Sequence, residues 1–243
     1  RRSWESSSSA KLVAPDAGCG KREGSSVSQR PPPDAEALAR WRQRLRVEGD
    51  GEAFATASSW LQPVRTRTGG AGMLKIARTP YERPGGAVMA AWKGEGAARV
   101  LALEGDAVVL SRTPSLADDL DDAAAVPILC DVVKRLHRTT PNGAPAVDTL
   151  ERRFRALRRE AGRDGRFAAA WAVARVLLGE PRERVLLHGD MHHGNVLWGG
   201  DGRGWLAIDP QAAVGERAYD YANLLKNPTR ERRLAPGRLR RVA

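Results

Sequence analysis

Residues 188–195 read HGDMHHGN, and this stretch holds three of the chain's four histidines together with Asp190 and Asn195. Short apolar runs flank it, 184-RVLL-187 before it and 196-VLW-198 after it. Such a stretch could be a polar turn between two strands, a metal-dependent hydrolase site or the catalytic loop of a phosphotransferase. These interpretations require different residues at different spacings, so the rest of the sequence can separate them.

A plain turn or a metal cage explains only part of the pattern. Gly194 and Asn195 favour a turn, but a turn gives no reason for Asp190, nor for Asp209 at the end of the next apolar run. A zinc site takes three or four His, Cys or carboxylate ligands. The one histidine outside the stretch is His137, and no DxH motif lies upstream, so a binuclear hydrolase lacks its distant ligands.

Phosphoryl transfer accounts for the carboxylates and the amide together. It needs a carboxylate that orients the attacking hydroxyl and accepts its proton, oxygen ligands for Mg²⁺, and a lysine on the phosphates. Asp190 and Asn195 have the D-x4-N spacing of a kinase catalytic loop, and Asp209 follows fourteen residues after Asn195. Lys75 lies far upstream in 73-MLKIA-77, a predicted strand. These residues occur in the chain order that a kinase-like phosphotransferase requires.

The first half of the chain is predicted to form a small antiparallel sheet with helices. Apolar runs separated by glycine-containing turns predict its strands: 60–67, 73–77, 98–105 and 106–112. Residues 34–45 carry apolar side chains at helical spacing. Between the strand pairs, Pro84, Gly85 and Gly86 disfavour a long helix, so a helix is expected only over 87-AVMAAW-92.

The second half is predicted to be mainly helical. Segments with apolar residues at helical spacing are 125–138, 147–160 and 166–179. Three short apolar runs predict strands around HGDMHHGN: 184–187, 195–199 and 205–210. The last two form a hairpin across the turn GGDGRG. The fold class is therefore α+β.

Charge and composition limit the possible partners. Hydrophobic residues make up 42% and charged residues 28% of the 243 residues, which is ordinary for a globular protein. Much of the net charge of +11 lies at the end, because residues 226–243 hold seven basic residues and one acidic residue. Only 5% of the residues are aromatic, and no zinc-finger or RNA-recognition motif is present. Nucleic acid is therefore not the expected partner.

Cysteine content and hydropathy predict the compartment. Cys19 and Cys130 are too few for a disulfide framework, which fits a reducing compartment. The first residues lack the apolar core of a secretory signal, and no apolar run reaches the ~18 residues of a membrane span. We therefore expect a cytoplasmic protein that does not bind a membrane. We also expect it to be a monomer. Residues 1–33 are rich in Ser, Gly, Pro and charge and are expected to be disordered.

Five segments resemble one family of kinases. They are MLKIA (73–77), WKGEGAARVLALEGDAVVL (92–110), HGDMHHGNVLW (188–198), GWLAIDPQ (204–211) and VGERAYDYANLLKNP (214–228). Together they resemble the aminoglycoside phosphotransferases of the streptomycin 6-phosphotransferase type, also described as aminoglycoside/hydroxyurea antibiotic resistance kinases. The resemblance covers roughly residues 33–228. Its specific parts are HGDxHHxN followed by IDP, and GEGAARVL.

The resemblance implies a bilobal, protein-kinase-like α+β fold. Its parts would be a disordered tail (1–33), a small antiparallel N-lobe that binds ATP (34–112), a mainly helical C-lobe with the catalytic loop (113–228) and a basic tail (229–243). The linker near 109-VLSR-112 would offer backbone groups to adenine. Family members continue in helices that complete the acceptor pocket, where this chain has TRERRLAPGRLRRVA, so a truncated C-lobe is expected.

The resemblance also implies the chemistry. ATP would be the donor, Mg²⁺ the metal and a hydroxyl of streptomycin or a related aminoglycoside the acceptor, with antibiotic resistance as the result. Asp190 would be the catalytic base, and Asn195 and Asp209 would hold Mg²⁺. Lys75 would contact the α- and β-phosphates and pair with Glu82 of the N-lobe helix.

Five further residues have roles that stay open. His188 would orient the loop by hydrogen bonding. His192 and His193 would line the acceptor side or help to neutralise the phosphates. Because streptomycin is a cation, Glu216 and Asp220 could line its pocket. Both could equally be structural, with Asp220 bracing the helix at YANLL.

Several departures from the family pattern keep alternatives open. Gln211 stands where Lys is common, and Ser111 stands where Glu is usual. The chain could therefore be a kinase of another small hydroxyl compound, with the same core and a different acceptor pocket. Pro84 disturbs the helix that should present Glu82 to Lys75, and the C-lobe is expected to be truncated, so the chain could also be an inactive kinase-like remnant.

Overall fold

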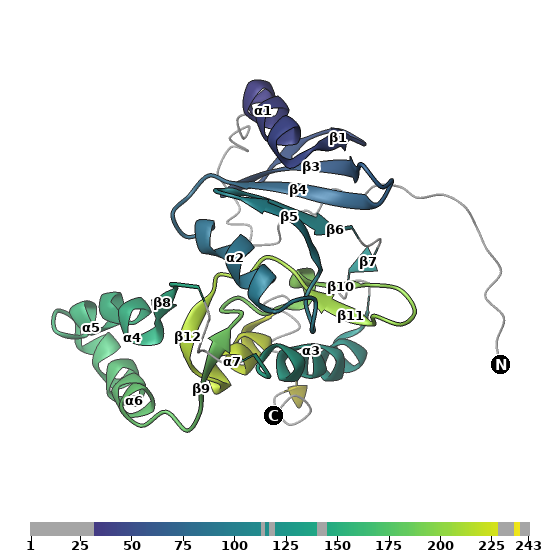
Figure 1. The fold of residues 1–243 in the computed structure, drawn as a ribbon. Coiled ribbons are helices and arrows are strands. Elements are labelled where there is room, and N and C mark those ends of the chain that lie inside the picture. The colour runs from purple at the N-terminus through teal and green to yellow at the C-terminus, as the bar shows by residue number, and fades with distance from the viewer. Residues whose placement is uncertain (1–31, 113–114, 117–119, 140–144, 228–235, 239–243) are drawn as a thin grey trace, which may run out of the picture.

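The computed structural model describes residues 32–112, 115–116, 120–139, 145–227 and 236–238. It shows a sheet-containing N-terminal part above a mainly helical C-terminal part (Figure 1). Nearly all of the predicted disordered tail and most of the predicted basic tail lie outside the described residues. The predicted α+β fold, with an antiparallel sheet followed by helices, is confirmed.

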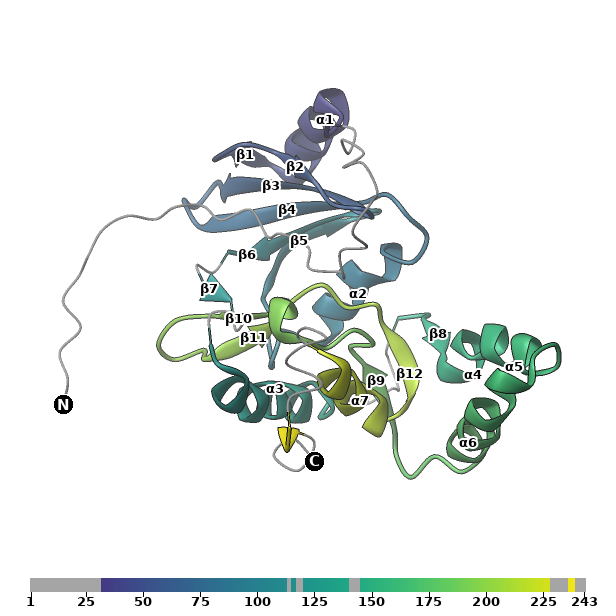
Figure 2. The same cartoon turned by 180° about the vertical axis from the view of Figure 1, so that it is seen from behind.

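The N-terminal part is built on one antiparallel sheet of strand order β1-β3-β4-β6-β5, with β2 paired to β3 (Figure 2). Its strands are β1 Val47–Gly49, β2 Phe54–Ala55, β3 Ser59–Thr66, β4 Ala71–Ala77, β5 Val100–Glu104 and β6 Ala107–Ser111. The two hairpins predicted from the glycine turns, β3–β4 and β5–β6, are confirmed. In β4, Leu74 and Ile76 are buried on one face, so Lys75 points to the other.

Helix α1 (Ala35–Leu45) covers the face of the sheet that holds Leu74. Leu38 is buried there, and Trp41 and Leu45 pack against the same cluster, so the predicted apolar helix face is confirmed. The side chain of Asp34 accepts a hydrogen bond from a backbone N–H of the first turn at 3.0 Å and caps the helix.

Helix α2 (Arg83–Ala91) begins earlier than expected, so the prediction of a helix confined to residues 87–92 is wrong. Pro84 lies in the first turn, where its missing N–H has no partner within the helix and its fixed φ suits the helix. The two glycines allow close packing. A Cβ on Gly85 would lie 3.3 Å from the carbonyl oxygen of Pro210, and one on Gly86 would lie 2.7 Å from Leu103 Cδ1.

The C-terminal part is mainly helical, as predicted. Its helices are α3 Asp122–Leu136, α4 Leu150–Arg153, α5 Arg155–Ala161, α6 Ala168–Gly179 and α7 Ala218–Lys226. The single helix predicted over residues 147–160 is divided at Phe154 into α4 and α5. Helices α4, α5 and α6 project to one side of the molecule (Figure 1). Among the described residues, no helix is long and apolar enough to cross a bilayer.

Two small sheets hold the HGDMHHGN loop between them. Their strands are β7 Ser115–Leu116, β8 Asp148–Thr149, β9 Arg184–Leu187, β10 Val196–Trp198, β11 Trp205–Ala207 and β12 Ala213–Glu216. The loop leaves β9 in the sheet β8-β12-β9 and enters β10 in the sheet β11-β10-β7. The predicted β10–β11 hairpin is confirmed. Strands β7, β8 and β12 escaped prediction because they are short and pair with partners distant in sequence.

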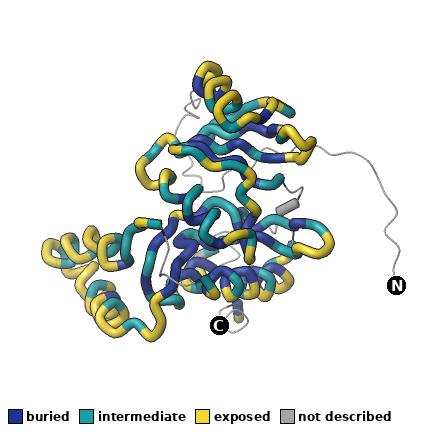
Figure 3. The backbone as a smooth tube through the Cα atoms, in the orientation of Figure 1, coloured by how far each residue is buried: buried dark blue, intermediate teal, exposed yellow. Residues whose placement is uncertain are grey.

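One apolar core joins the two parts of the molecule. It contains Met89 and Trp92 from the α2 region, Leu110 from β6, Leu129 from α3 and Met191 from the HGDMHHGN loop. Figure 3 shows the buried positions running through the centre, whereas α5 and α6 are largely exposed. The loop is therefore anchored in the core through Met191, directly after Asp190.

Candidate active site

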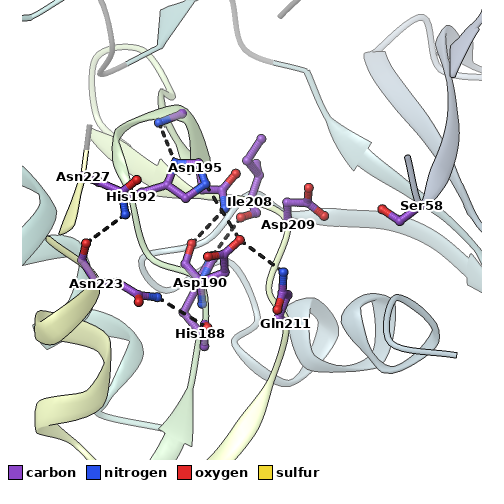
Figure 4. A network of polar contacts seen from close by, with 12 residues as sticks. Ser58, His188, Asp190, His192, Asn195, Ile208, Asp209, Gln211, Asn223 and Asn227 are labelled. Atoms are coloured by element: carbon purple, nitrogen blue, oxygen red, sulfur yellow. Dashed lines mark hydrogen bonds and ion pairs between the residues drawn. The ribbon is translucent and has the colours of Figure 1, made fainter. Parts of the chain in front are cut away.

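Strand pairing brings the predicted site residues together. β9 leads into the loop, and the β10–β11 hairpin leads from Asn195 to Asp209. The backbone N–H of Ile208 donates a hydrogen bond to the carbonyl oxygen of Asn195 at 2.9 Å, which places Asp209 beside the loop. Figure 4 shows Asp190, Asn195 and Asp209 gathered at one place.

Asp190 lies on the open side of the loop, with its side chain 30% exposed. Gln211 Nε2 donates a hydrogen bond to Asp190 Oδ2 at 3.3 Å, and His192 Nε2 lies 3.8 Å from the same oxygen. Asn195 Nδ2 donates to the backbone carbonyl of Asp190 at 2.9 Å, closing the loop on itself. The carboxylate is held in place and is still accessible, as a base acting on a hydroxyl must be.

His188 is fully buried behind Asp190. Its Nε2 donates a hydrogen bond to the carbonyl oxygen of Ile208 at 2.8 Å, and its Nδ1 accepts one from the backbone N–H of Asp190 at 3.3 Å. Burial lowers the pKa of His188 and outweighs the opposing effect of Asp220. A neutral ring with its proton on Nε2 satisfies both hydrogen bonds, so His188 joins the loop to the segment before Asp209.

Asp220 braces the loop rather than a ligand pocket. Its buried carboxylate accepts hydrogen bonds from the backbone N–H groups of His188 at 2.9 Å and Gly189 at 2.8 Å. His137 Nε2 lies 2.9 Å from the same carboxylate. Asp220 is therefore placed to brace the loop that carries Asp190, and not its own helix.

Asn195 and Asp209 present oxygen atoms suited to a hard cation. Because Asn195 Nδ2 is engaged within the loop, its Oδ1 is the atom that could bind a metal. Asp209 has a φ of 60°, a left-handed conformation that is uncommon outside glycine and concentrates at functional sites. Among the described residues, no group of three or more His, Cys, Asp or Glu is placed to hold a metal. One amide and one carboxylate fit Mg²⁺, which takes its other ligands from phosphates and water.

Lys75 reaches this site from the N-terminal sheet. Its ammonium group pairs with Glu82 at the start of α2 and with Asp209, so the predicted Lys75–Glu82 ion pair forms despite Pro84. Burial opposes the charge of Lys75, but the carboxylates of Asp209 and Glu82 outweigh burial and raise its pKa. The three side chains line one pocket together with Gly85. Lys75 is therefore a fixed cation where phosphates would need one.

The two histidines of the HH pair point in different directions. His192 Nδ1 accepts a hydrogen bond from the backbone N–H of Gly194 at 3.1 Å, and its ring stays partly exposed near Asp190. His193 is buried, with Nε2 lying 3.4 Å from Asp122 Oδ1 at the start of α3. Of the two, His192 is the one whose ring is exposed beside Asp190, whereas His193 faces α3.

Glu216 lies away from this site. It pairs in register with Arg184, the first residue of β9, whereas the catalytic loop follows the last residue of that strand. Its carboxylate accepts hydrogen bonds from the backbone N–H groups of Arg182 and Ala218. The structure does not bring Glu216 to Asp190, and its role is to tie together the ends of β9 and β12.

Sequence reasoning missed two residues that complete the site. Ser58, before β3, donates a hydrogen bond from Oγ to Glu82 Oε1 at 3.0 Å. Gln211 appeared in the sequence only as a departure from the family pattern, yet it contacts the carboxylate of Asp190. A serine in a short loop carries no distinctive sequence signal. The contact of Gln211 with Asp190 depends on the path of the backbone after Asp209, which the sequence does not show.

Comparison with known proteins agrees with this geometry. The family model described as aminoglycoside/hydroxyurea antibiotic resistance kinase matches residues 44–243. A streptomycin 3''-kinase of Klebsiella pneumoniae is 44% identical over 209 residues, which cover 81% of this chain and 77% of the relative. A streptomycin 6-kinase of Streptomyces glaucescens is 31% identical over 202 residues, 76% of this chain and 63% of that protein.

The fold is also that of solved phosphotransferases. An amicoumacin kinase in complex with AMP-PNP, Ca²⁺ and Ami matches 80% of this chain and 69% of its own, with a TM-score of 0.55 and 17% identity. The kinase-like fold predicted from the sequence is thereby confirmed. The match to the family model, together with the identity to the two streptomycin kinases, shows that this chain belongs to the aminoglycoside/hydroxyurea antibiotic resistance kinase family.

Proposed function

We propose that this chain is an ATP-dependent O-phosphotransferase that phosphorylates a hydroxyl of streptomycin or a related aminoglycoside and so confers resistance. The observation that carries the proposal is the meeting of Lys75 from the N-terminal sheet with Asp209, beside the loop of Asp190 and Asn195. The names of the two relatives support streptomycin as the acceptor. They differ in the hydroxyl group that they name, so the position of transfer is left to experiment.

In the proposed reaction each side chain acts where the structure holds it. Asp190 orients the acceptor hydroxyl and accepts its proton as the hydroxyl oxygen attacks the γ-phosphorus of ATP. The bond between the γ-phosphorus and the oxygen that bridges it to the β-phosphate breaks, and ADP leaves. Gln211 holds Oδ2 of that carboxylate in place. Lys75 offers its positive charge to the phosphates, and Glu82 fixes the direction of the lysine side chain.

Mg²⁺ is the metal that we propose for this site. Asn195 Oδ1 and the carboxylate of Asp209 would hold it together with phosphate oxygens. When bound, it would neutralise negative charge on the phosphates. The cytoplasmic location, the monomeric state and the division into lobes at residue 112 stay predictions.

The base is tested by Asp190→Ala. The variant should lose about 10²–10⁴-fold in kcat, the usual contribution of a positioned general base, while its ATP affinity stays within a few-fold of wild type. The measurement is the mass of the product after incubation with ATP, Mg²⁺ and streptomycin. Asp201→Ala, in the exposed turn between β10 and β11, is the control and should behave as wild type. An Asp190→Ala protein with wild-type turnover would contradict the assignment.

The acceptor is tested separately. Wild-type protein is incubated with radiolabelled ATP and a panel of aminoglycosides, choline and sugars. Transfer to streptomycin with a gain of one phosphoryl group supports the proposal. Transfer only to another compound would replace the acceptor but keep the class of reaction. Nucleotide-dependent thermal stabilisation without any transfer would favour an inactive remnant.

A further inference from the structure

Arg238 is a buried cation at the far end of the chain. Its side chain is 1% exposed, in a stretch that the sequence assigns to a basic tail. It forms a bidentate ion pair with Asp122, with Nε 2.7 Å from Oδ2 and Nη2 3.0 Å from Oδ1. A buried guanidinium group is tolerated only when its donors are satisfied. Arg238 is therefore part of the folded core and not of a solvated tail.

The same guanidinium group binds the end of α7. Nη1 donates to the carbonyl oxygen of Leu225 at 2.9 Å, and Nη2 donates to those of Leu224 at 3.0 Å and Asn227 at 2.6 Å. The last carbonyl groups of a helix have no partner within the helix, and a cation there is favourable. In Figures 1 and 2 the segment 236–238 lies beside α3 and α7. Arg238 thus joins the start of α3 to the end of α7.

These two helices hold opposite ends of the catalytic loop. α7 carries Asp220, which accepts hydrogen bonds from the backbone N–H groups of His188 and Gly189. α3 begins with Asp122, whose Oδ1 lies 3.4 Å from the Nε2 of the buried His193. Asp190 lies between these two supports.

We propose that Arg238 is a positioning residue, which locks α7 to α3 and thereby fixes both ends of the loop that carries Asp190. Its effect on turnover rests on the proposed function, but its effect on the loop does not. Loss of the Arg238 contacts leaves the Asp122 carboxylate, whose side chain is only 20% exposed, with fewer donors and lets α7 move relative to α3. Displacements of about 1 Å in a catalytic group reduce rates by about a hundredfold.

The loop itself is tested by hydrogen exchange on the full chain. Arg238→Lys keeps the charge but cannot form the bidentate pair. Peptides covering residues 188–195 should exchange faster than in wild type, whereas peptides from α1 should be unchanged. Arg166→Lys, at an 85% exposed side chain, is the control and should leave both regions as they are. Unchanged exchange over residues 188–195 in a folded Arg238→Lys protein would overturn the proposal, whatever the enzyme does.

Kinetics separate positioning from general stability. In Arg238→Lys, kcat should fall about ten- to a hundredfold, with the KM for ATP within about twofold. His193 and Arg238 both contact Asp122. The double variant Arg238→Lys, His193→Gln should therefore lose no more kcat than the worse of the two single variants. Fully additive losses, or unchanged kcat in the folded single variant, would count against the proposal. If Arg238→Lys does not fold, Asp122→Asn carries the same predictions, since it weakens the pair and keeps the side-chain shape.

Discussion

At the scale of single residues, the backbone of the catalytic loop is held by buried groups before any substrate arrives. The N–H groups of His188 and Gly189 both point at the carboxylate of Asp220, which requires a tight turn between the buried strand β9 and Asp190. Gly189 takes the left-handed conformation with a φ of 79°. The G of HGD is therefore needed for the shape of the turn as well as for space.

Gly189→Ala tests this requirement. A Cβ there would lie 2.8 Å from Arg153 Nη1 and 3.0 Å from the carbonyl oxygen of Gln211, and the carbonyl cannot move as a flexible side chain would. Gly200→Ala is the matched control, because Gly200 has a φ of 85° and no atom within 4 Å of an added Cβ. In the control the free energy of unfolding should fall only by the roughly 1–2 kcal/mol that the left-handed conformation costs a residue with a Cβ. Gly189→Ala should lose more free energy of unfolding in urea than the control, and its kcat should also fall. Equal losses of unfolding free energy in the two variants would contradict the packing argument.

The lowered pKa of His188 leads us to expect that the stability of the protein depends on pH. Its pKa in the folded protein lies below the ordinary value of 6.5, because burial disfavours the charged ring. Between these two values the unfolded chain binds a proton that the folded chain does not, so stability falls as pH drops through 6.5. In His188→Gln the melting temperature should change less steeply between about pH 5 and 8. Identical pH profiles for the two proteins would show that another group is responsible.

At the scale of elements, α2 shows how tertiary packing overrides local preference. Proline and two glycines in 84-PGG-86 are poor helix formers, and yet they form its first turn. Small residues let the helix approach both the sheet and the segment after Asp209. This approach presents Glu82 to Lys75, so a segment that is unfavourable as an isolated helix is suited to its place in the fold.

Pro84→Ala separates these effects. Alanine fits the first turn of a helix, so the Lys75–Glu82 pair and turnover should be retained within about twofold. The unfolded chain gains conformational freedom when the proline is removed, so stability should fall by roughly 0.4–1 kcal/mol. Urea unfolding and steady-state kinetics measure the two quantities. A large loss of activity without loss of stability would mean that Pro84 itself shapes the site.

At the scale of the whole molecule, the N- and C-terminal parts share one apolar core. Residues of α2, β6, α3 and the catalytic loop belong to the same buried cluster. A site assembled between the two parts therefore has a continuous support beneath it. We expect the described parts of the chain to unfold in a single transition.

Leu129→Ala tests this expectation. Leu129 is fully buried in the shared core, so the substitution should lower the free energy of unfolding by about 2–5 kcal/mol. Far-UV circular dichroism and tryptophan fluorescence should report one coincident, shifted transition. Val176→Ala, at a 57% exposed position on α6, should change stability by less than about 0.5 kcal/mol. Two separate transitions, of which Leu129→Ala shifts only one, would show that the parts unfold independently.

The sequence by itself determined what depends on short separations along the chain. The D-x4-N spacing of Asp190 and Asn195 and the hairpin leading to Asp209 are local, because strand, turn and strand follow one another directly. The alternation around Lys75 likewise placed it on a strand with apolar neighbours. These features were enough to indicate phosphoryl transfer.

Only the tertiary structure decided the contacts between distant segments. Lys75 and Asp209 are 134 residues apart in the chain, and Arg238 and Asp122 are 116 apart. No periodicity encodes such pairs, since they depend on how packed helices and sheets bring the ends of elements together. For the same reason HGDMHHGN could be recognised from its spacing, whereas the burial of His193 and the binding of Arg238 between α3 and α7 required the folded molecule.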